Sequence, residues 1–315
     1  MQKTNKQRST MRLISSANCL LPLIVLLLSL AASDAAAYFH RPRRFVNSYE
    51  IGVSAGISNY FGDLASYYPD PRVLHPAAGL LFRYQYTQRW AFRAAIFHGT
   101  ISGNDAYLIP KYFMDRNLSF TSAIDEFSVG AEWHKRFFNI CRHLTYSPFV
   151  FAGLAVFHYN PYTTYNNKKY YLQPLSTEGQ GTSAYPDRHP YLLTQVSIPV
   201  ASGMKIALFQ RWVISAEIGV RKTFTDYLDD VSKTYADPTV LATEKGVATV
   251  ALADPTPFQS SLSWHPGYIR GNPRNEDWYV YSNISVTYIF KSPCLKYHRP
   301  KSRRVMYCPP IGKPR

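Results

Sequence analysis

The chain has 315 residues, with 35 lysines and arginines against 20 aspartates and glutamates, and a formal net charge of +15. That length allows one large or two small domains. The cations gather at the ends: residues 291–315 hold eight and no acid, and Arg41, Arg43 and Arg44 precede the first patterned segment. Because the body between is almost neutral, the charge argues against nucleic-acid binding and favours contact with a partner or with lipid headgroups.

Residues 1–37 have the pattern of a secretory signal peptide. A basic start (1–12) precedes an apolar run (20–32) and small residues that end at Ala37, with Met11 as an alternative start. No later stretch reaches 18 continuous apolar residues. We therefore expect an exported product that is either soluble or held in a membrane as a β-barrel.

Eight segments alternate apolar and polar residues with period two, as strands do. They lie at 48–58, 77–86, 89–99, 126–134, 147–159, 192–208, 212–221 and 277–290. Segment 147–159 is apolar on both faces, so its register stays ambiguous. Segment 192–208 is less regular, and Pro199 is expected to kink it.

The connections predict the topology. Short connections (87–89, 138–146, 209–211) alternate with long polar ones (62–76, 99–119, 160–190, 223–276). This alternation is typical of outer-membrane barrels, with tight periplasmic turns and long external loops. Aromatic residues at the strand ends favour an interfacial girdle: Tyr84, Tyr86, Trp90, Trp133, Trp212, Trp278 and Tyr288.

The sequence therefore predicts an all-β protein, an eight-stranded antiparallel transmembrane β-barrel over residues 48–290 in the outer membrane. A basic segment (38–47) and a basic tail (291–315) would lie in the periplasm. The alternative is a soluble lipocalin-like barrel or sandwich, whose small lumen the large aromatic face would overfill.

Charged residues of both signs fall on the inward face of these strands. Eight strands leave an interior only wide enough for side chains, and unpaired charges there would be costly. We expect a closed lumen filled by one ion-pair network and no diffusion pore, so that function lies on loops, turns and tails. The network would contain Glu50, Arg83, Arg93, Glu126, Glu132, Glu217 and Arg221.

The longest loop begins with an acidic stretch. Asp226, Asp229 and Asp230 lie within five positions, which could suit a hydrolase site, a bound cation or a polar loop. The stretch lacks the alternating carboxylates and central glycine of an EF-hand loop. The simplest expectation is a short helical turn with Asp226 near its N-terminus and solvated carboxylates, and no catalytic site.

An enzyme is not predicted. The histidines are scattered over different segments, and the chain has no G-x-S-x-G, H-E-x-x-H or nucleotide-binding glycine motif. No cofactor, metal or small-molecule substrate is expected. A lipid-modifying barrel enzyme stays an alternative, since a triad assembled in space is invisible in one sequence. The histidines in question are His75, His98, His134, His143, His158 and His189.

Three cysteines remain after signal cleavage: Cys141, Cys294 and Cys308. Their spacing matches no zinc site. Because the envelope is oxidising, one disulfide is expected. All three should face the periplasm, which favours Cys294–Cys308, with Cys141–Cys294 as the alternative.

Several blocks of sequence carry a resemblance to a known family: residues 58–64, 89–105, 147–165, 171–181, 217–232 and 270–290. Together they resemble the PorG family of outer-membrane barrels in the type IX (Por) secretion system, over nearly all of 48–290. The resemblance implies a component associated with the periplasmic ring of the lipoprotein PorK and its partner PorN. It supplies no catalytic residue. The alternative is a surface barrel that binds a ligand or an adhesion partner through its external loops.

The basic tail lies outside that resemblance. Its composition is typical of a segment that becomes ordered on a partner. We expect it to dock on an acidic surface of the periplasmic ring in a salt-sensitive way. The candidate contacts are Lys296, Arg299, Arg303 and Arg304.

Overall fold

The computed structural model describes residues 47–65, 70–108, 116–136, 138, 144–208, 211–256, 266–274 and 276–290. The signal peptide, segment 38–46 and the tail 291–315 lie outside these ranges. The predicted disulfide and the tail contacts therefore stay predictions. The residues concerned are Cys141, Cys294, Cys308, Lys296, Arg299, Arg303 and Arg304.

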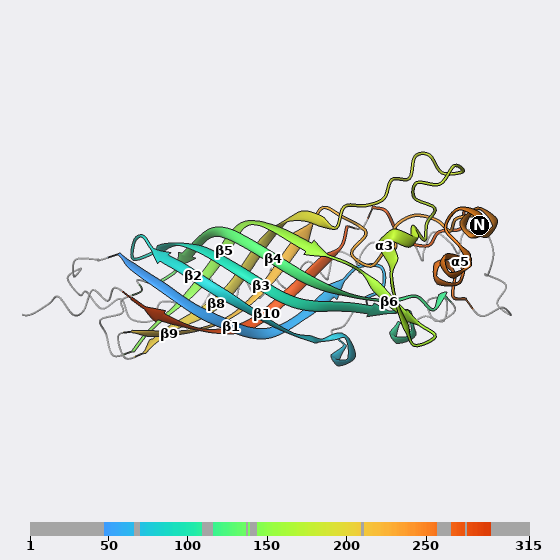
Figure 1. Cartoon of the computed structure of the whole chain (residues 1–315). Coiled ribbons are helices and arrows are strands. Elements are labelled where there is room, and N and C mark those ends of the chain that lie inside the picture. Colours follow the sequence, from blue (N-terminus) through green and yellow to red (C-terminus); the bar gives the residue numbers. More distant parts are fainter. Residues whose placement is uncertain are drawn as a thin grey trace, which may run out of the picture.

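Eight long antiparallel strands close into a barrel (Figure 1). They are β1 (Ser48–Phe61), β2 (His75–Gln85), β3 (Trp90–Asn104), β4 (Ser119–His134), β5 (Leu144–Tyr159), β8 (Thr194–Leu208), β9 (Trp212–Thr223) and β10 (Trp278–Ile289). Each strand pairs with the next of the eight along the chain, and β10 pairs with β1. The predicted eight-stranded antiparallel barrel is confirmed.

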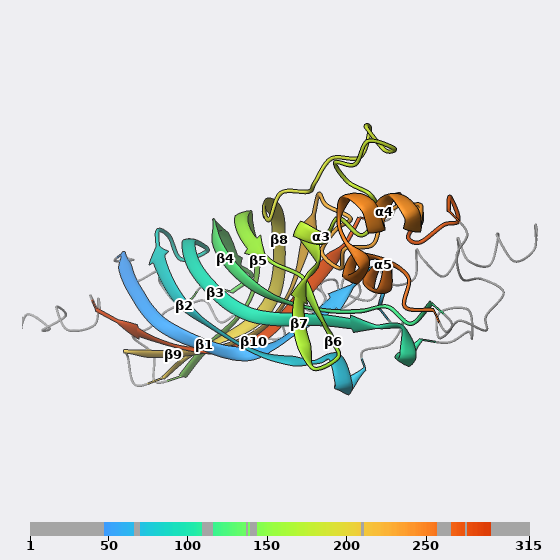
Figure 2. The ribbon, with the colours of Figure 1, turned by 45° about the vertical axis from the view of Figure 1, so that its right-hand side comes forward.

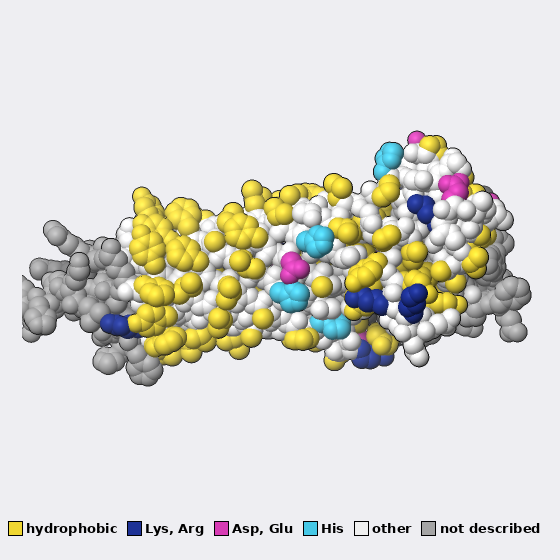
Figure 3. Space-filling model, viewed as in Figure 1, with side chains coloured by type: hydrophobic (Ala, Val, Ile, Leu, Met, Phe, Trp, Pro, Cys, Tyr) yellow, Lys and Arg dark blue, Asp and Glu magenta, His cyan; other side chains and the backbone are white. Residues whose placement is uncertain are grey.

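The two faces of each strand differ in burial, as period two requires. On β4, Phe127 is 53% exposed and points outward, whereas the neighbouring Glu126 is 2% exposed and points inward. Outward-facing apolar side chains of all eight strands form a band around the barrel (Figure 3). A closed barrel pairs its backbone groups internally, and an apolar band of this kind fits a bilayer. The protein is an outer-membrane β-barrel.

Aromatic side chains ring the end of the barrel that carries the short turns. Tyr49 and Tyr84 stack with ring centroids 4.9 Å apart, and Trp212 and Tyr288 meet edge to face at 5.1 Å. Trp278 belongs to the other end, where the Nζ of Lys222 lies 4.6 Å from its ring. In outer-membrane barrels the short turns usually face the periplasm.

The register of β5, ambiguous in the sequence, is set by its odd-numbered residues. Phe149, Phe151 and Phe157 are buried inside the barrel, whereas Leu154 and Val156 are 67% and 48% exposed to the outside. The larger apolar side chains therefore fill the lumen, and the branched aliphatic ones face lipid.

The long connections fold into ordered structure at the other end of the barrel (Figures 1 and 2). They contain the hairpin β6 (Tyr162–Tyr165) and β7 (Lys168–Tyr171), the helices α3 (Leu172–Leu175), α4 (Pro238–Glu244) and α5 (Val247–Ala253), and the 3-10 turns η1 (Pro71–Val73) and η2 (Asp105–Tyr107). We call the described residues of these connections the cap. None of the helices in the described part of the chain is long and apolar enough to cross a membrane.

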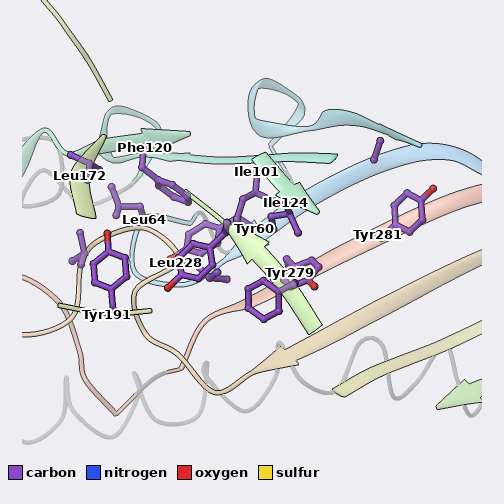
Figure 4. Packing of buried hydrophobic residues seen from close by; sticks show 14 of the residues in the cluster. Tyr60, Leu64, Ile101, Phe120, Ile124, Leu172, Tyr191, Leu228, Tyr279 and Tyr281 are labelled. Atoms are coloured by element: carbon purple, nitrogen blue, oxygen red, sulfur yellow. The ribbon is translucent and has the colours of Figure 1, made fainter. Parts of the chain in front are cut away.

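A shared hydrophobic core joins the cap to the barrel mouth (Figure 4). Tyr60 of β1 packs edge to face on Phe120 of β4 at 4.9 Å, and Leu64 and Leu228 from the cap join the same cluster. Each large apolar side chain buried in this way contributes about 1.5–3 kcal/mol. The cap is therefore packed onto the barrel rather than suspended above it.

Candidate functional site

All seven charged residues expected in the lumen point into it and are buried or nearly so. Arg83 lies at the centre of one group. Its Nη1 is 2.6 Å from Oε2 of Glu50, and its Nε is 3.0 Å from Oε2 of Glu132. Strands β1, β2 and β4 are thus tied together across the interior.

A second group lies nearer the cap. Nη1 of Arg93 is 2.5 Å from Oε2 of Glu217, and Nε of Arg221 is 3.2 Å from Oε2 of Glu126. The hydroxyl of Tyr279 donates a hydrogen bond of 2.6 Å to Oε2 of Glu126. Nη1 of Arg93 also lies 3.7 Å from a carboxylate oxygen of Glu132, which links the two groups.

Sequence reasoning missed two members of this network. Nζ of Lys205 lies 3.3 Å from Oε1 of Glu50 and 3.5 Å from Oε1 of Glu132. His134 Nε2 lies 2.6 Å from Oε1 of Glu132. Lys205 follows the period-two pattern of β8, a signal obscured by Pro199 in the same segment. With it, four glutamates face three arginines and a lysine.

Little space is left between these side chains. A cavity of about 20 Å³ lies among Arg93, Glu126, Glu217 and Arg221. That volume holds about one water molecule. The interior is therefore filled by its own side chains at this level.

The acidic stretch of the cap differs from its expected form. Residues 226–230 form no helical turn, and Asp226, Asp229 and Asp230 are all buried. The expectation of solvated carboxylates was wrong because this loop folds inward over the barrel mouth. For Asp229 and Asp230, hydroxyl groups, a backbone N–H group and Arg270 occupy the place of water.

Asp230 is held by side chains from three other parts of the chain. Its carboxylate accepts hydrogen bonds from the hydroxyls of Thr177 and Tyr191, and Nη2 of Arg270 lies 3.9 Å away. Burial raises the pKa of Asp230 to about 6, although Arg270 and the two hydroxyls oppose the rise.

Two arginines neutralise further carboxylates of the cap. Arg116 forms a two-point contact with Asp105, with distances of 2.7 and 2.6 Å. Nη1 of Arg270 lies 3.2 Å from Oε1 of Glu178, which also accepts the backbone N–H of Ser232 at 2.9 Å. These contacts fix the loops relative to one another.

Asp229 and Asp277 share a single hydroxyl. The Tyr60 hydroxyl lies 2.7 Å from Oδ2 of Asp229 and 2.8 Å from Oδ1 of Asp277. Because that hydroxyl carries one proton, it donates to one carboxylate and accepts from the other, which must hold a proton. Burial and repulsion from neighbouring carboxylates raise the pKa of both aspartates well above its ordinary value.

Asp226 and Asp63 complete this cluster. Burial raises the pKa of Asp226 to about 8, opposed by the Ser232 hydroxyl and reinforced by Asp63. Burial likewise raises the pKa of Asp63, whose Oδ2 accepts the N–H of Asn272 at 2.6 Å. We call Asp63, Asp226, Asp229 and Asp277 the acidic quartet.

The quartet is suited to holding protons. None of its members forms an ion pair with a described residue. Within the ranges that the structure covers, no group of three or more histidine, cysteine, aspartate or glutamate side chains is arranged to hold a metal ion. Protons shared among neighbouring carboxyl groups account for the burial of so many acids.

The blocks of sequence that carry the family resemblance meet at this cluster. Tyr60 and Asp63 belong to block 58–64, Glu178 to block 171–181, and Asp277 to block 270–290. Block 217–232 contributes the acidic stretch itself. No local spacing could have revealed that these four blocks come together.

Comparisons with known proteins give a family and several distant folds. The family model described as "Domain of unknown function (DUF6089)" matches residues 39–242. No curated protein matches the chain. Neisserial surface protein A is 7% identical, with a TM-score of 0.37 over 78% of this chain and 99% of that one.

Two further solved structures are similar at the same level. The attachment invasion locus protein Ail of Yersinia pestis, in complex with the heparin analogue sucrose octasulfate, is 9% identical, with a TM-score of 0.35 over 78% of this chain and 97% of that one. The outer membrane protein OprG of Pseudomonas aeruginosa is 9% identical, with a TM-score of 0.35 over 78% and 95%. At these scores the architecture rests on the strand pairing of the chain itself.

Proposed function

This chain belongs to the DUF6089 family, and we propose that it is a non-conducting outer-membrane component of the type IX secretion machinery. In this role it anchors or organises the periplasmic ring at the outer membrane. The filled, charge-balanced lumen is the observation that carries the non-conducting part of the proposal. The resemblance of six sequence blocks to the PorG family supports the assignment to that machinery.

The position of the chain ends supports an anchoring role. Ser48 at the start of β1 pairs with Gln85, and Ile289 at the end of β10 pairs with Glu50, so both ends leave the barrel on the short-turn side. The chain therefore enters β1 and leaves β10 on the side where the proposed periplasmic ring would lie. The tail cations supply charge for an acidic docking surface.

The proposal includes no catalytic activity. Asp229 and Asp277 are 1% and 0% exposed, and their oxygens are engaged by Tyr60 and by the backbone N–H groups of Val231 and Leu228. A general acid or base has to reach its substrate. These groups instead hold the cap together.

Co-purification tests the anchoring role. The tagged full-length protein, extracted in mild detergent, should recover the PorK-like lipoprotein and its PorN-like partner. Truncation after Lys291, which keeps Phe290 and β10 intact, should weaken this recovery, most strongly at low salt, where the tail charges of the full-length protein are least screened. A barrel that still shifts in mobility when unboiled but recovers neither ring protein would contradict the proposal. Recovery of a surface ligand instead would favour the alternative function of the external loops.

Conductance tests the non-conducting role separately. The purified barrel in a planar bilayer should give no stable conductance steps. The variant Arg93→Ala, which removes a side chain that lines the small cavity of the lumen, provides the comparison. Regular steps from the wild-type protein would contradict a filled lumen.

A further inference from the structure

A polar row marks the cap-side edge of the apolar band. Nδ1 of His98 lies 2.6 Å from Oδ1 of Asp125, and both side chains point outward with exposures of 66% and 63%. His158 on β5 stands directly opposite Asp125. A charged side chain on the lipid face costs up to about 2–4 kcal/mol at mid-membrane and about 0–1 kcal/mol near the interface. The row therefore lies at the interface, where the yellow band of Figure 3 gives way to histidine and carboxylate side chains.

The hairpin β6–β7 lies just beyond this row. Tyr162 of β6 pairs with Thr121 of β4. Thr121 precedes Asp125 by four residues and therefore lies about 13 Å nearer the cap along the strand. Asn166 and Asn167 at its tip both have positive φ, 49° and 59°, which suits a tight two-residue turn. Figures 1 and 2 show the hairpin at the rim of the barrel, apart from α4 and α5.

The hairpin carries two exposed cations held over aromatic rings. Nζ of Lys169 lies 3.5 Å from the ring centroid of Tyr162 and 4.8 Å from that of Tyr171, and Nζ of Lys168 lies 5.4 Å from that of Tyr170. No carboxylate among the described residues forms an ion pair with either lysine. Arg72 also lies over an aromatic ring, that of Tyr107, but unlike the two lysines it is paired with a carboxylate, Asp70.

We propose that the β6–β7 hairpin binds the phosphate of lipid headgroups in the external leaflet. It lies beyond the polar row that marks the edge of the apolar band, on the side of the headgroup layer. Its two ammonium groups, which pair with no described carboxylate, complement a phosphate. Tyrosine side chains are enriched at membrane–water interfaces, where an apolar region meets water. Because the hairpin continues the lipid-facing surface of β4, a membrane lipid is favoured over a soluble polyanion.

Native mass spectrometry of the full-length barrel tests this binding. The protein is kept in a neutral maltoside detergent and titrated with phosphatidic acid. Phosphatidylcholine, whose phosphate is balanced by the cationic choline group, is the comparison with no net headgroup charge. Each cation near an anionic surface is worth about a fivefold change in affinity, so Lys168→Gln/Lys169→Gln should weaken phosphatidic acid binding about 30-fold. Lys168→Glu/Lys169→Glu should weaken it further.

The matched control removes two charges elsewhere on the cap, as Lys245→Gln/Arg274→Gln, and should bind like the wild type. All variants are checked for the mobility shift of the unboiled barrel. Equal binding by wild type and both lysine variants, or equal loss in the control, would overturn the proposal. Displacement of phosphatidic acid by millimolar inorganic phosphate would also overturn it, because the site would then belong to a soluble anion.

Discussion

The lumen and the cap both bury many charges, yet they neutralise them in different ways. In the lumen, four glutamates face three arginines and a lysine. In the cap, six buried carboxylates and the half-buried Asp63 face two buried arginines, Arg116 and Arg270. The surplus acids of the cap are those of the quartet. Asp63, Asp229 and Asp277 accept hydrogen bonds from a hydroxyl or from backbone N–H groups, and both oxygens of Asp226 are buried without a hydrogen-bond partner among the described residues.

The surroundings explain this difference. The lumen lies inside a membrane-spanning barrel, where water does not solvate an unpaired charge. Each buried charge there requires a fixed counter-charge. The cap borders water, so its carboxyl groups can take up protons as the loops that carry them fold. We therefore expect the cap to respond to pH and the lumen to depend on each individual partner.

Removing one lumen cation should have the largest effect. Arg83→Met leaves Glu50 and Glu132 with reduced compensation, and the loss of one partner of a buried pair costs about 3–5 kcal/mol. The urea midpoint of the barrel, followed by unboiled gel mobility, should fall accordingly. The double variant Glu50→Gln/Arg83→Met should recover part of the loss. A single variant Arg83→Met as stable as the wild type would contradict the dependence of the lumen charges on individual partners.

Removing a cap arginine should have a smaller and local effect. Arg270→Met deprives Glu178 and Asp230 of their cation, which we expect to destabilise the cap by about 2–3 kcal/mol because protonation offsets part of the cost. The amides of Ser232 and Lys233 should exchange hydrogen faster. The barrel midpoint in urea should stay unchanged, and a parallel fall would show that cap and barrel unfold as one unit.

The pH response of the cap should depend on Asp226. Its pKa is raised to about 8, so the folded cap binds this proton more tightly than the unfolded chain does. The cap should lose stability as pH rises from about 4 to about 8, by an amount on the order of 1–3 kcal/mol after allowance for solvent screening. Asp226→Asn should flatten this dependence in limited proteolysis from pH 4 to 9 while secretion continues. An unchanged pH profile in this variant would show that Asp226 does not set the pH dependence of the cap.

The smallest effect is expected at the outer edge of the apolar band. Asp125→Asn removes a charge that lies at the interface and should change the urea midpoint by less than about 1 kcal/mol. A charge placed inside the band, as Phe127→Asp, should cost more and serves as the matched comparison. Equal costs would mean that the membrane covers Asp125.

The barrel was predictable from sequence because its rule is local. Alternation along each strand separates Glu126 from Phe127, and turn lengths give the order of strands. Lys205 and the orientation of β5 were missed because their segments are apolar or irregular on both faces. The same rule still applies to them once the pairing partners are known.

The cap could not be predicted in the same way. Asp229 is buried because Tyr60 and Asp277, distant in sequence, reach it from other segments. Polar loop composition ordinarily indicates solvent exposure, and nothing local distinguishes an acid that will share a proton. The acidic stretch was therefore noticed, but the expectation that its carboxylates are solvated was wrong.

The length of β3 and β4 has a mechanical consequence. They contain 15 and 16 residues, and their pairing runs unbroken from Trp90 and Trp133 to Asn104 and Ser119. A membrane needs only about 9–11 residues of a tilted strand, so the surplus lifts the rim about 12 Å clear of the lipid core. The paired strands β3 and β4 form a continuous rigid connection between the two ends of the barrel. A torque applied at the periplasmic turns is delivered to the outer surface without a hinge to absorb it.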